Sequence, residues 1–121
     1  MDKKKWKGLI KRNCIAVGTY NKAFEPIIET LADILAKRDA AEELYIKTGA
    51  RLIIPHTNKA GASNLEQNPT IRLINDLNRD ALTYWRDLGL TPAGLKKIND
   101  EAIKKENAMS DLDRVLMNLE K

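Results

Sequence analysis

The side chains that carry most catalytic chemistry are scarce in this sequence of 121 residues. Its only histidine is His56 and its only cysteine is Cys14. A nucleophilic triad needs a base that an acid orients beside the nucleophile, and a zinc site needs three or four ligands. One histidine and one cysteine supply neither, so we interpret His56 as a loop residue. A lone cysteine also forms no disulfide within the chain, which favours a reducing compartment.

The 17 carboxylates also lack the arrangement of a catalytic site. Residues such as Glu29, Asp33 and Asp76 fall on polar faces of predicted helices, and no phosphate-binding Gly-x-x-x-x-Gly-Lys-Ser/Thr loop occurs. A Mg²⁺-dependent nuclease needs carboxylates grouped in a buried site. We therefore predict a protein that is not an enzyme and has neither cofactor nor metal. A nuclease that uses helix-face carboxylates is the enzymatic alternative.

The clearest binding signal is the charge of the first twelve residues. They hold six cations against Asp2, a net charge of +5, whereas the other 109 residues sum to −1. Cations neutralise phosphates, and a tryptophan among them can stack on a base. An equally weighted alternative is a solubilising tail with the tryptophan as a core anchor. The first hypothesis predicts DNA contacts from Lys3, Lys4, Lys5, Trp6, Lys7, Lys11 and Arg12.

Composition and hydropathy are those of one globular domain. Hydrophobic residues make up 43% of the chain and charged residues 31%. The longest apolar runs are far shorter than the roughly 20 residues that cross a bilayer. Charges also interrupt any N-terminal stretch that could serve as a signal peptide. We therefore expect no membrane partner and a protein that stays where it is made.

Two long helices dominate the predicted fold. Apolar residues from Phe24 to Leu35 recur at steps of three and four, which predicts a helix over about 25–48 with Pro26 in its first turn and Gly49 after it. Residues 20–24 form a separate turn or a kinked extension. Asn68-Pro69 pairs an N-cap with a first-turn proline, so a second helix should run to Leu88. The fold class is therefore all-α, with two long antiparallel helices and short flanking helices.

The remaining segments predict smaller elements. Residues 50–67 are rich in β-branched and turn residues, which fits a small β-hairpin or an ordered loop, and Pro55 restricts any strand there to an edge. Thr91-Pro92 predicts a third helix that turns sharply against the second. Ser110-x-x-Asp113 resembles a capping box and predicts a short C-terminal helix. Such a helix must fold against the chain or a partner, and its apolar residues are Leu112, Val115, Leu116 and Leu119.

These elements suggest three segments: a basic N-terminal arm with a short helix over 1–19, a helical core and oligomerisation domain over 20–105, and a C-terminal helix with a partner-binding role over 106–121. The first long helix would span roughly 35 Å, a length that often packs between subunits. The alternative is an ordinary intramolecular hairpin with the second long helix, a pairing that we expect in either case. The candidate core or oligomerisation residues are Ile27, Leu31, Leu35, Tyr45, Ile74 and Trp85.

The order of several motifs resembles one known family. Asn58-Lys59-x-Gly61, Asn68-Pro69 and Leu88-Gly89-Leu90-Thr91-Pro92 follow an apolar helix with Tyr45 and Gly49 near its end. This set, spread over residues 20–98, resembles the small subunits of tailed-bacteriophage terminases. The most specific pieces are the Asn-Pro that opens the second long helix and the Leu-Gly-Leu-Thr-Pro hinge after it.

The resemblance implies a non-enzymatic subunit of the DNA-packaging machine in the cytoplasm of the infected bacterial host. Such subunits form ring-like homo-oligomers, bind double-stranded viral DNA and modulate a large subunit that holds the ATPase and nuclease. Many place a helix-turn-helix before the core and the large-subunit contact near the C-terminus. Here the residues before Tyr20 leave space for one short helix. A small dimeric helical DNA-binding transcriptional regulator is the alternative function.

Overall fold

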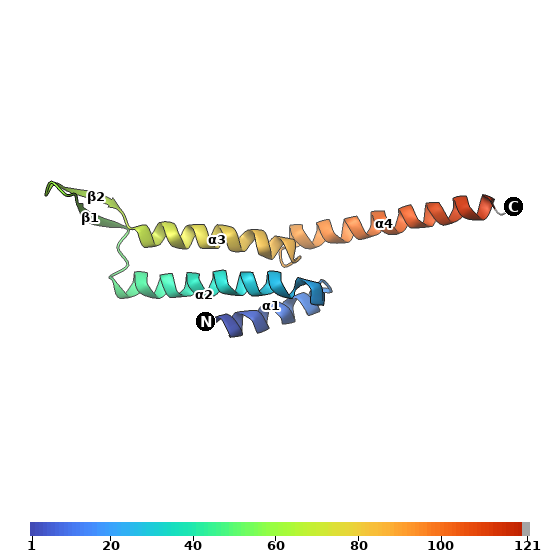
Figure 1. Ribbon diagram of the computed structural model, residues 1–121, viewed down its shortest axis with the longest axis horizontal. Coiled ribbons are helices and arrows are strands. Elements are labelled where there is room, and N and C mark those ends of the chain that lie inside the picture. The colour runs from blue at the N-terminus through green and yellow to red at the C-terminus, as the bar shows by residue number, and fades with distance from the viewer. Residues whose placement is uncertain (120–121) are drawn as a thin grey trace.

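The computed structural model describes residues 1–119, and Figure 1 shows their elongated arrangement. Glu120 and Lys121, at the end of the predicted C-terminal segment, lie outside the described residues. In chain order the elements are α1 (Lys3–Val17), η1 (Lys22–Phe24), α2 (Glu25–Lys47), β1 (Ile53–Thr57), β2 (Ser63–Gln67), α3 (Pro69–Asp87) and α4 (Pro92–Leu119).

Helices α2 and α3 form the antiparallel pair that the sequence predicts (Figure 1). Each begins with a proline in its first turn, where the missing N–H costs no hydrogen bond. The side chain of Asn68 caps α3 by accepting a hydrogen bond from the Thr70 N–H. The last residue of each helix lies one position before the predicted end. Residues 22–24 form the short 3₁₀-helix η1, so the separate turn is the alternative that the structure adopts.

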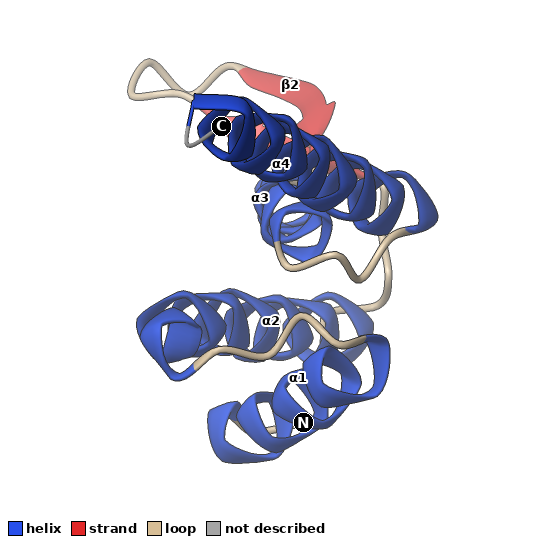
Figure 2. Cartoon of the chain, turned by 90° about the vertical axis from the view of Figure 1, so that its right-hand side faces the viewer, coloured by secondary structure: helices blue, strands red, loops and turns tan. Residues whose placement is uncertain are grey.

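Helix α1 packs against α2 and completes the core (Figure 2). Asp2 caps its first turn, and Gly18 ends it in the left-handed conformation at φ 80°. The core lies where α1, α2 and the C-terminal part of α3 meet. Its buried residues are Ile10, Cys14, Ile28, Leu31, Ala32, Leu35, Ala81 and Leu88.

A β-hairpin projects from the end of the α2–α3 pair (Figure 1). Its two strands are antiparallel, with Pro55 opposite Leu65, so the hairpin rather than the ordered loop is correct. The Asn58 side-chain carbonyl closes the turn by accepting from the N–H groups of Ala60 and Ala62 at 3.0 Å. The sheet has only these two strands in the part of the chain described here, so both are edges, and Pro55 is tolerated.

The C-terminal part of the chain differs from the prediction. Residues 92–119 form one helix, so the separate helix expected from Ser110 is wrong, and the flanking helix at this end of the chain is long rather than short. No glycine or proline lies between Leu95 and Leu119, and Ser110 has helix formers on both sides. A capping-box sequence therefore does not start a helix where the preceding turn is already helical.

The prediction of a sharp turn between α3 and α4 is also wrong. Helix α4 leads away from the bundle, roughly along the direction of α3 (Figures 1 and 2). A Cβ at Gly94 would lie 2.2 Å from the Arg86 carbonyl oxygen, so only glycine permits this close contact of the two helix ends. At Gly89, φ is 73°. The junction thus directs α4 outward, and only its first turns touch α3.

Candidate nucleic-acid and partner interfaces

Helix α1 presents cations on its outer side and its apolar side to the core. The six predicted cations divide into two sets. Lys3 lies 3.3 Å from Glu29, and Lys7 and Lys11 lie 3.9 and 3.5 Å from Glu25, so these three face acidic residues of α2. The other three make no ion pair within residues 1–119. They are Lys4, Lys5 and Arg12, and all are exposed.

Lys4, Gly8 and Arg12 are four residues apart, so they share the outer face of α1. Because Gly8 has no side chain, the Arg12 guanidinium can lie close to the helix backbone there, and a Cβ at Gly8 would be 3.4 Å from Arg12 Nη1. Lys5 lies two turns before Arg12 on the same side of the helix. This outer face, made of Lys4, Lys5, Gly8 and Arg12, is called the α1 cationic face below.

Trp6 is oriented inward, away from the α1 cationic face. Its Nε1 donates a hydrogen bond to Asp39 Oδ2 at 2.7 Å, and its ring meets that of Trp85 edge to face at 6.4 Å. The Arg38 guanidinium lies 5.5 Å from the Trp6 ring centroid. The indole therefore makes the contacts that the core-anchor alternative describes.

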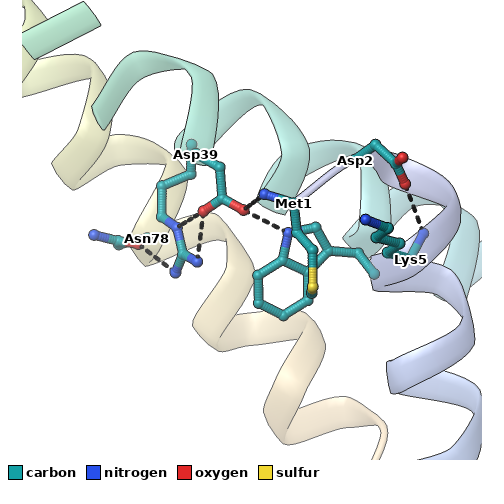
Figure 3. A network of polar contacts seen from close by, with 7 residues as sticks. Met1, Asp2, Lys5, Asp39 and Asn78 are labelled. Atoms are coloured by element: carbon teal, nitrogen blue, oxygen red, sulfur yellow. Dashed lines mark hydrogen bonds and ion pairs between the residues drawn. The ribbon is translucent and has the colours of Figure 1, made fainter. Parts of the chain in front are cut away.

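The network around Trp6 joins three helices (Figure 3). Asp39 also accepts from the Met1 α-amino group at 2.9 Å and from Arg38, and Arg38 reaches Asn78 on α3 at 3.3 Å. Burial by itself would raise the pKa of the Asp39 carboxyl. The hydrogen bonds from Met1, Trp6 and Arg38 outweigh burial and hold this pKa below its ordinary value. Asp39 is therefore a charged anchor for α1.

A second network lies at the junction of α1, η1 and α2. The Tyr20 hydroxyl donates to Glu25 Oε1 at 2.5 Å, and the Lys11 ammonium lies 5.2 Å from the Tyr20 ring centroid. The hydrogen bond from Tyr20 lowers the pKa of Glu25, and the charges of Tyr20 and Glu25 raise the pKa of Lys11. Glu25 and Lys11 are thus held in their charged forms at neutral pH.

The candidate core or oligomerisation residues divide by burial. Leu31 and Leu35 are fully buried in the core, and Trp85 packs against its edge. Ile27 is 37% exposed. Tyr45 and Ile74 line an apolar groove of about 380 Å³ beside the α2–α3 pair, together with Glu42, Ile46, Leu52 and Ile71.

A second groove lies on the other flank of the α2–α3 pair. Its volume is about 350 Å³, and the exposed Leu44 and Leu73 belong to it. The sequence analysis did not predict this groove because its apolar residues belong to two different helices. The signal that could have predicted it is the helical spacing of apolar residues in α2 and α3, combined with the antiparallel pairing of these helices. The lining residues are Lys37, Ala40, Ala41, Leu44, Leu73 and Leu77.

The predicted partner-binding residues lie on the projecting part of α4. All four side chains are at least half exposed, and the exposed fraction of Leu119 is 76%. Residues 99–119 are all exposed to solvent, and this part of α4 projects beyond the other helices (Figure 1). An apolar series on a bare helix is typical of an interaction surface. Its members are Leu112, Val115, Leu116 and Leu119.

The described residues hold no cluster of three or more His, Cys, Asp or Glu side chains that could bind a metal. His56 lies on the exposed hairpin, 3.5 Å from Glu66. Cys14 is buried, and burial raises the pKa of its thiol, which makes it a poor nucleophile. Within residues 1–119, no helix is both long and apolar enough to span a membrane.

The fold defines a mostly helical protein with a cationic helix at one side and a projecting helix at one end. A family model described as the small subunit of phage terminase matches residues 3–112. The chain therefore belongs to the phage terminase small-subunit family, which associates it with phage DNA packaging. No curated protein and no solved structure matches the chain.

Proposed function

We propose that this chain is the DNA-recognition and regulatory subunit of a phage DNA-packaging terminase, with no enzymatic activity of its own. It acts in the cytoplasm of the infected bacterial host, binds double-stranded viral DNA, and modulates the large ATPase and nuclease subunit. Family membership supports this role. The observation that carries the DNA contact is the α1 cationic face on a helix whose other face is anchored in the core.

The α1 cationic face binds phosphates rather than bases. Lys4, Lys5 and Arg12 already point away from the bundle, and no carboxylate within residues 1–119 pairs with them. Lys3, Lys7 and Lys11 flank them and strengthen the positive field, although Glu25 and Glu29 partly neutralise these three. Such a surface gives salt-dependent attraction with little sequence preference. Trp6 supports this surface by fixing α1 on α2.

The grooves on the two flanks of the α2–α3 pair support self-association. They have different lining residues, so a contact between one groove and the other groove of a second copy joins unlike surfaces. Contacts between unlike surfaces close into rings when the rotation between neighbours is favourable. We propose a ring-like homo-oligomer in which these flanks meet. A ring repeats the α1 cationic face and multiplies a weak DNA contact.

A charge-matched pair of variants tests the DNA contact. Replacing Lys4, Lys5 and Arg12 by Ala removes three outward cations of α1. Replacing Lys96, Lys97 and Lys104 by Ala removes three exposed cations of α4 and gives the same net charge. The measurement is the affinity for a duplex DNA fragment over a series of salt concentrations. The α1 variant should bind more weakly, and its slope of log affinity against log salt should be shallower by about 0.9 for each phosphate that it no longer neutralises.

The α4 variant should keep the affinity and the salt slope of the unchanged protein. Circular dichroism on both variants confirms that the helices remain folded. Equal decreases in affinity for the two variants would mean that DNA binding depends on the net charge of the protein and not on the position of the cations. An unchanged affinity of the α1 variant would place the DNA site on another element.

A further inference from the structure

The projecting helix α4 carries a regular seam along one side. From Leu95 the spacing alternates between three and four residues, which is the seven-residue repeat of a two-stranded coiled coil. Seven of the eight seam positions are apolar, and the exception is Lys105. The seam consists of Leu95, Ile98, Ala102, Lys105, Met109, Leu112, Leu116 and Leu119.

The molecule covers only the start of this seam. Leu95 and Ile98 are half-buried and lie beside Gly89 at the α3–α4 junction. From Ala102 to Leu119 every seam position is exposed. A coiled-coil seam that continues from a packed junction into solvent lacks its second helix.

Charges beside the seam indicate which helix fits. Among residues 95–119, the charged residues at the positions that flank a coiled-coil seam are Glu101, Glu106 and Asp113, all acidic and exposed. Four cations, Lys96, Lys97, Lys104 and Arg114, lie farther from the seam. Two copies of α4 would place these carboxylates opposite one another, and like charges at such positions destabilise the pair.

We propose that the α4 seam binds a basic amphipathic helix of a different protein, with apolar residues along its seam and lysine or arginine beside it. A carboxylate in the partner's seam would pair with Lys105. This inference rests on the proposed function, because it specifies the chemistry of the partner that α4 contacts. The basic helix of a second copy does not fit, since Ile10 and Cys14 on the apolar side of α1 are fully buried.

Two synthetic helical peptides test this selectivity. Both have leucine at the seam positions and one glutamate opposite Lys105. One has lysine at the flanking positions and the other has glutamate there. Fluorescence anisotropy of each labelled peptide, titrated with the full chain, measures binding. The lysine peptide should bind at least about tenfold more tightly, because each flanking pair changes from repulsion to attraction.

Variants assign that binding to the seam and its flanks. Glu101→Lys, Glu106→Lys and Asp113→Lys together should invert the peptide preference. Leu112→Asn with Leu116→Asn should abolish binding of the lysine peptide. Ile103→Asn with Met117→Asn, which changes two exposed apolar residues outside the seam, should retain it.

Equal binding of the two peptides, or no binding of either, would overturn the inference. It would also be overturned if α4 self-associates, which is seen as a fall in mass when Leu112 and Leu116 become Asn. DNA affinity, measured on the same preparations, separates the two proposals. Loss of selectivity with intact DNA binding rejects only the partner chemistry, whereas loss of DNA binding with intact selectivity rejects only the DNA contact.

Discussion

At the scale of single residues, Asp39 attaches α1 to the helical pair through a partly buried network. It receives hydrogen bonds from Trp6 and the Met1 amine, and its side chain is 21% exposed. Because its pKa is lowered by folding, the charged form stabilises the native state. That contribution is complete above the ordinary aspartate pKa of about 3.9 and is lost as the pH falls through the lower folded pKa.

We therefore expect Asp39→Asn to destabilise the protein at pH 7 by about 1–2 kcal/mol, since it weakens charge-assisted hydrogen bonds. The stability of this variant should also fall less than that of the unchanged protein between about pH 5 and pH 2. Urea unfolding followed by tryptophan fluorescence measures both effects. Asp33→Asn is the control on the same helix, because its exposed ion pair with Lys37 should have a smaller effect than the Asp39 network. Equal effects of the two changes would contradict this role of Asp39.

At the scale of elements, two sites with similar capping sequences behave differently. Asn68 is a true N-cap, 7% exposed, that accepts from the Thr70 N–H and donates to the Arg51 carbonyl at 3.0 Å. Ser110 has the same kind of signal but lies inside α4. The difference is whether helical turns already precede the residue.

Alanine substitution distinguishes these two roles. Asn68→Ala should lower the free energy of unfolding by about 1–2 kcal/mol, because it removes a cap and leaves buried polar groups unpaired. Ser110→Ala should leave helix content unchanged or raise stability by about 0.5 kcal/mol, because alanine is the better helix former. Circular dichroism with thermal and urea unfolding measures both. A loss of helix content in the Ser110 variant would mean that α4 starts anew there.

At the scale of the whole molecule, we expect assembly through the flanks of the α2–α3 pair. Light scattering behind a sizing column should give a mass many times the 13.7 kDa of one chain. Leu44→Asp with Leu73→Asp introduces charge into one groove and should lower that mass. Leu112→Asn with Leu116→Asn on α4 should leave it unchanged. A dimer mass is what the transcriptional-regulator hypothesis predicts, and a monomer at high concentration would contradict the proposed ring.

By itself the sequence determined the two long helices and the cationic character of α1, because caps, periodicity and charge are local properties. It also contained the α4 seam, which the assumed break at Ser110 concealed. Only the tertiary structure decided the inward position of Trp6, the division of the α1 cations into paired and outward sets, and the direction of α4. These depend on partners such as Trp6 with Asp39, or Thr19 with Leu88, which are 33 and 69 residues apart. No local pattern specifies such contacts, because they form only when packing brings distant segments together.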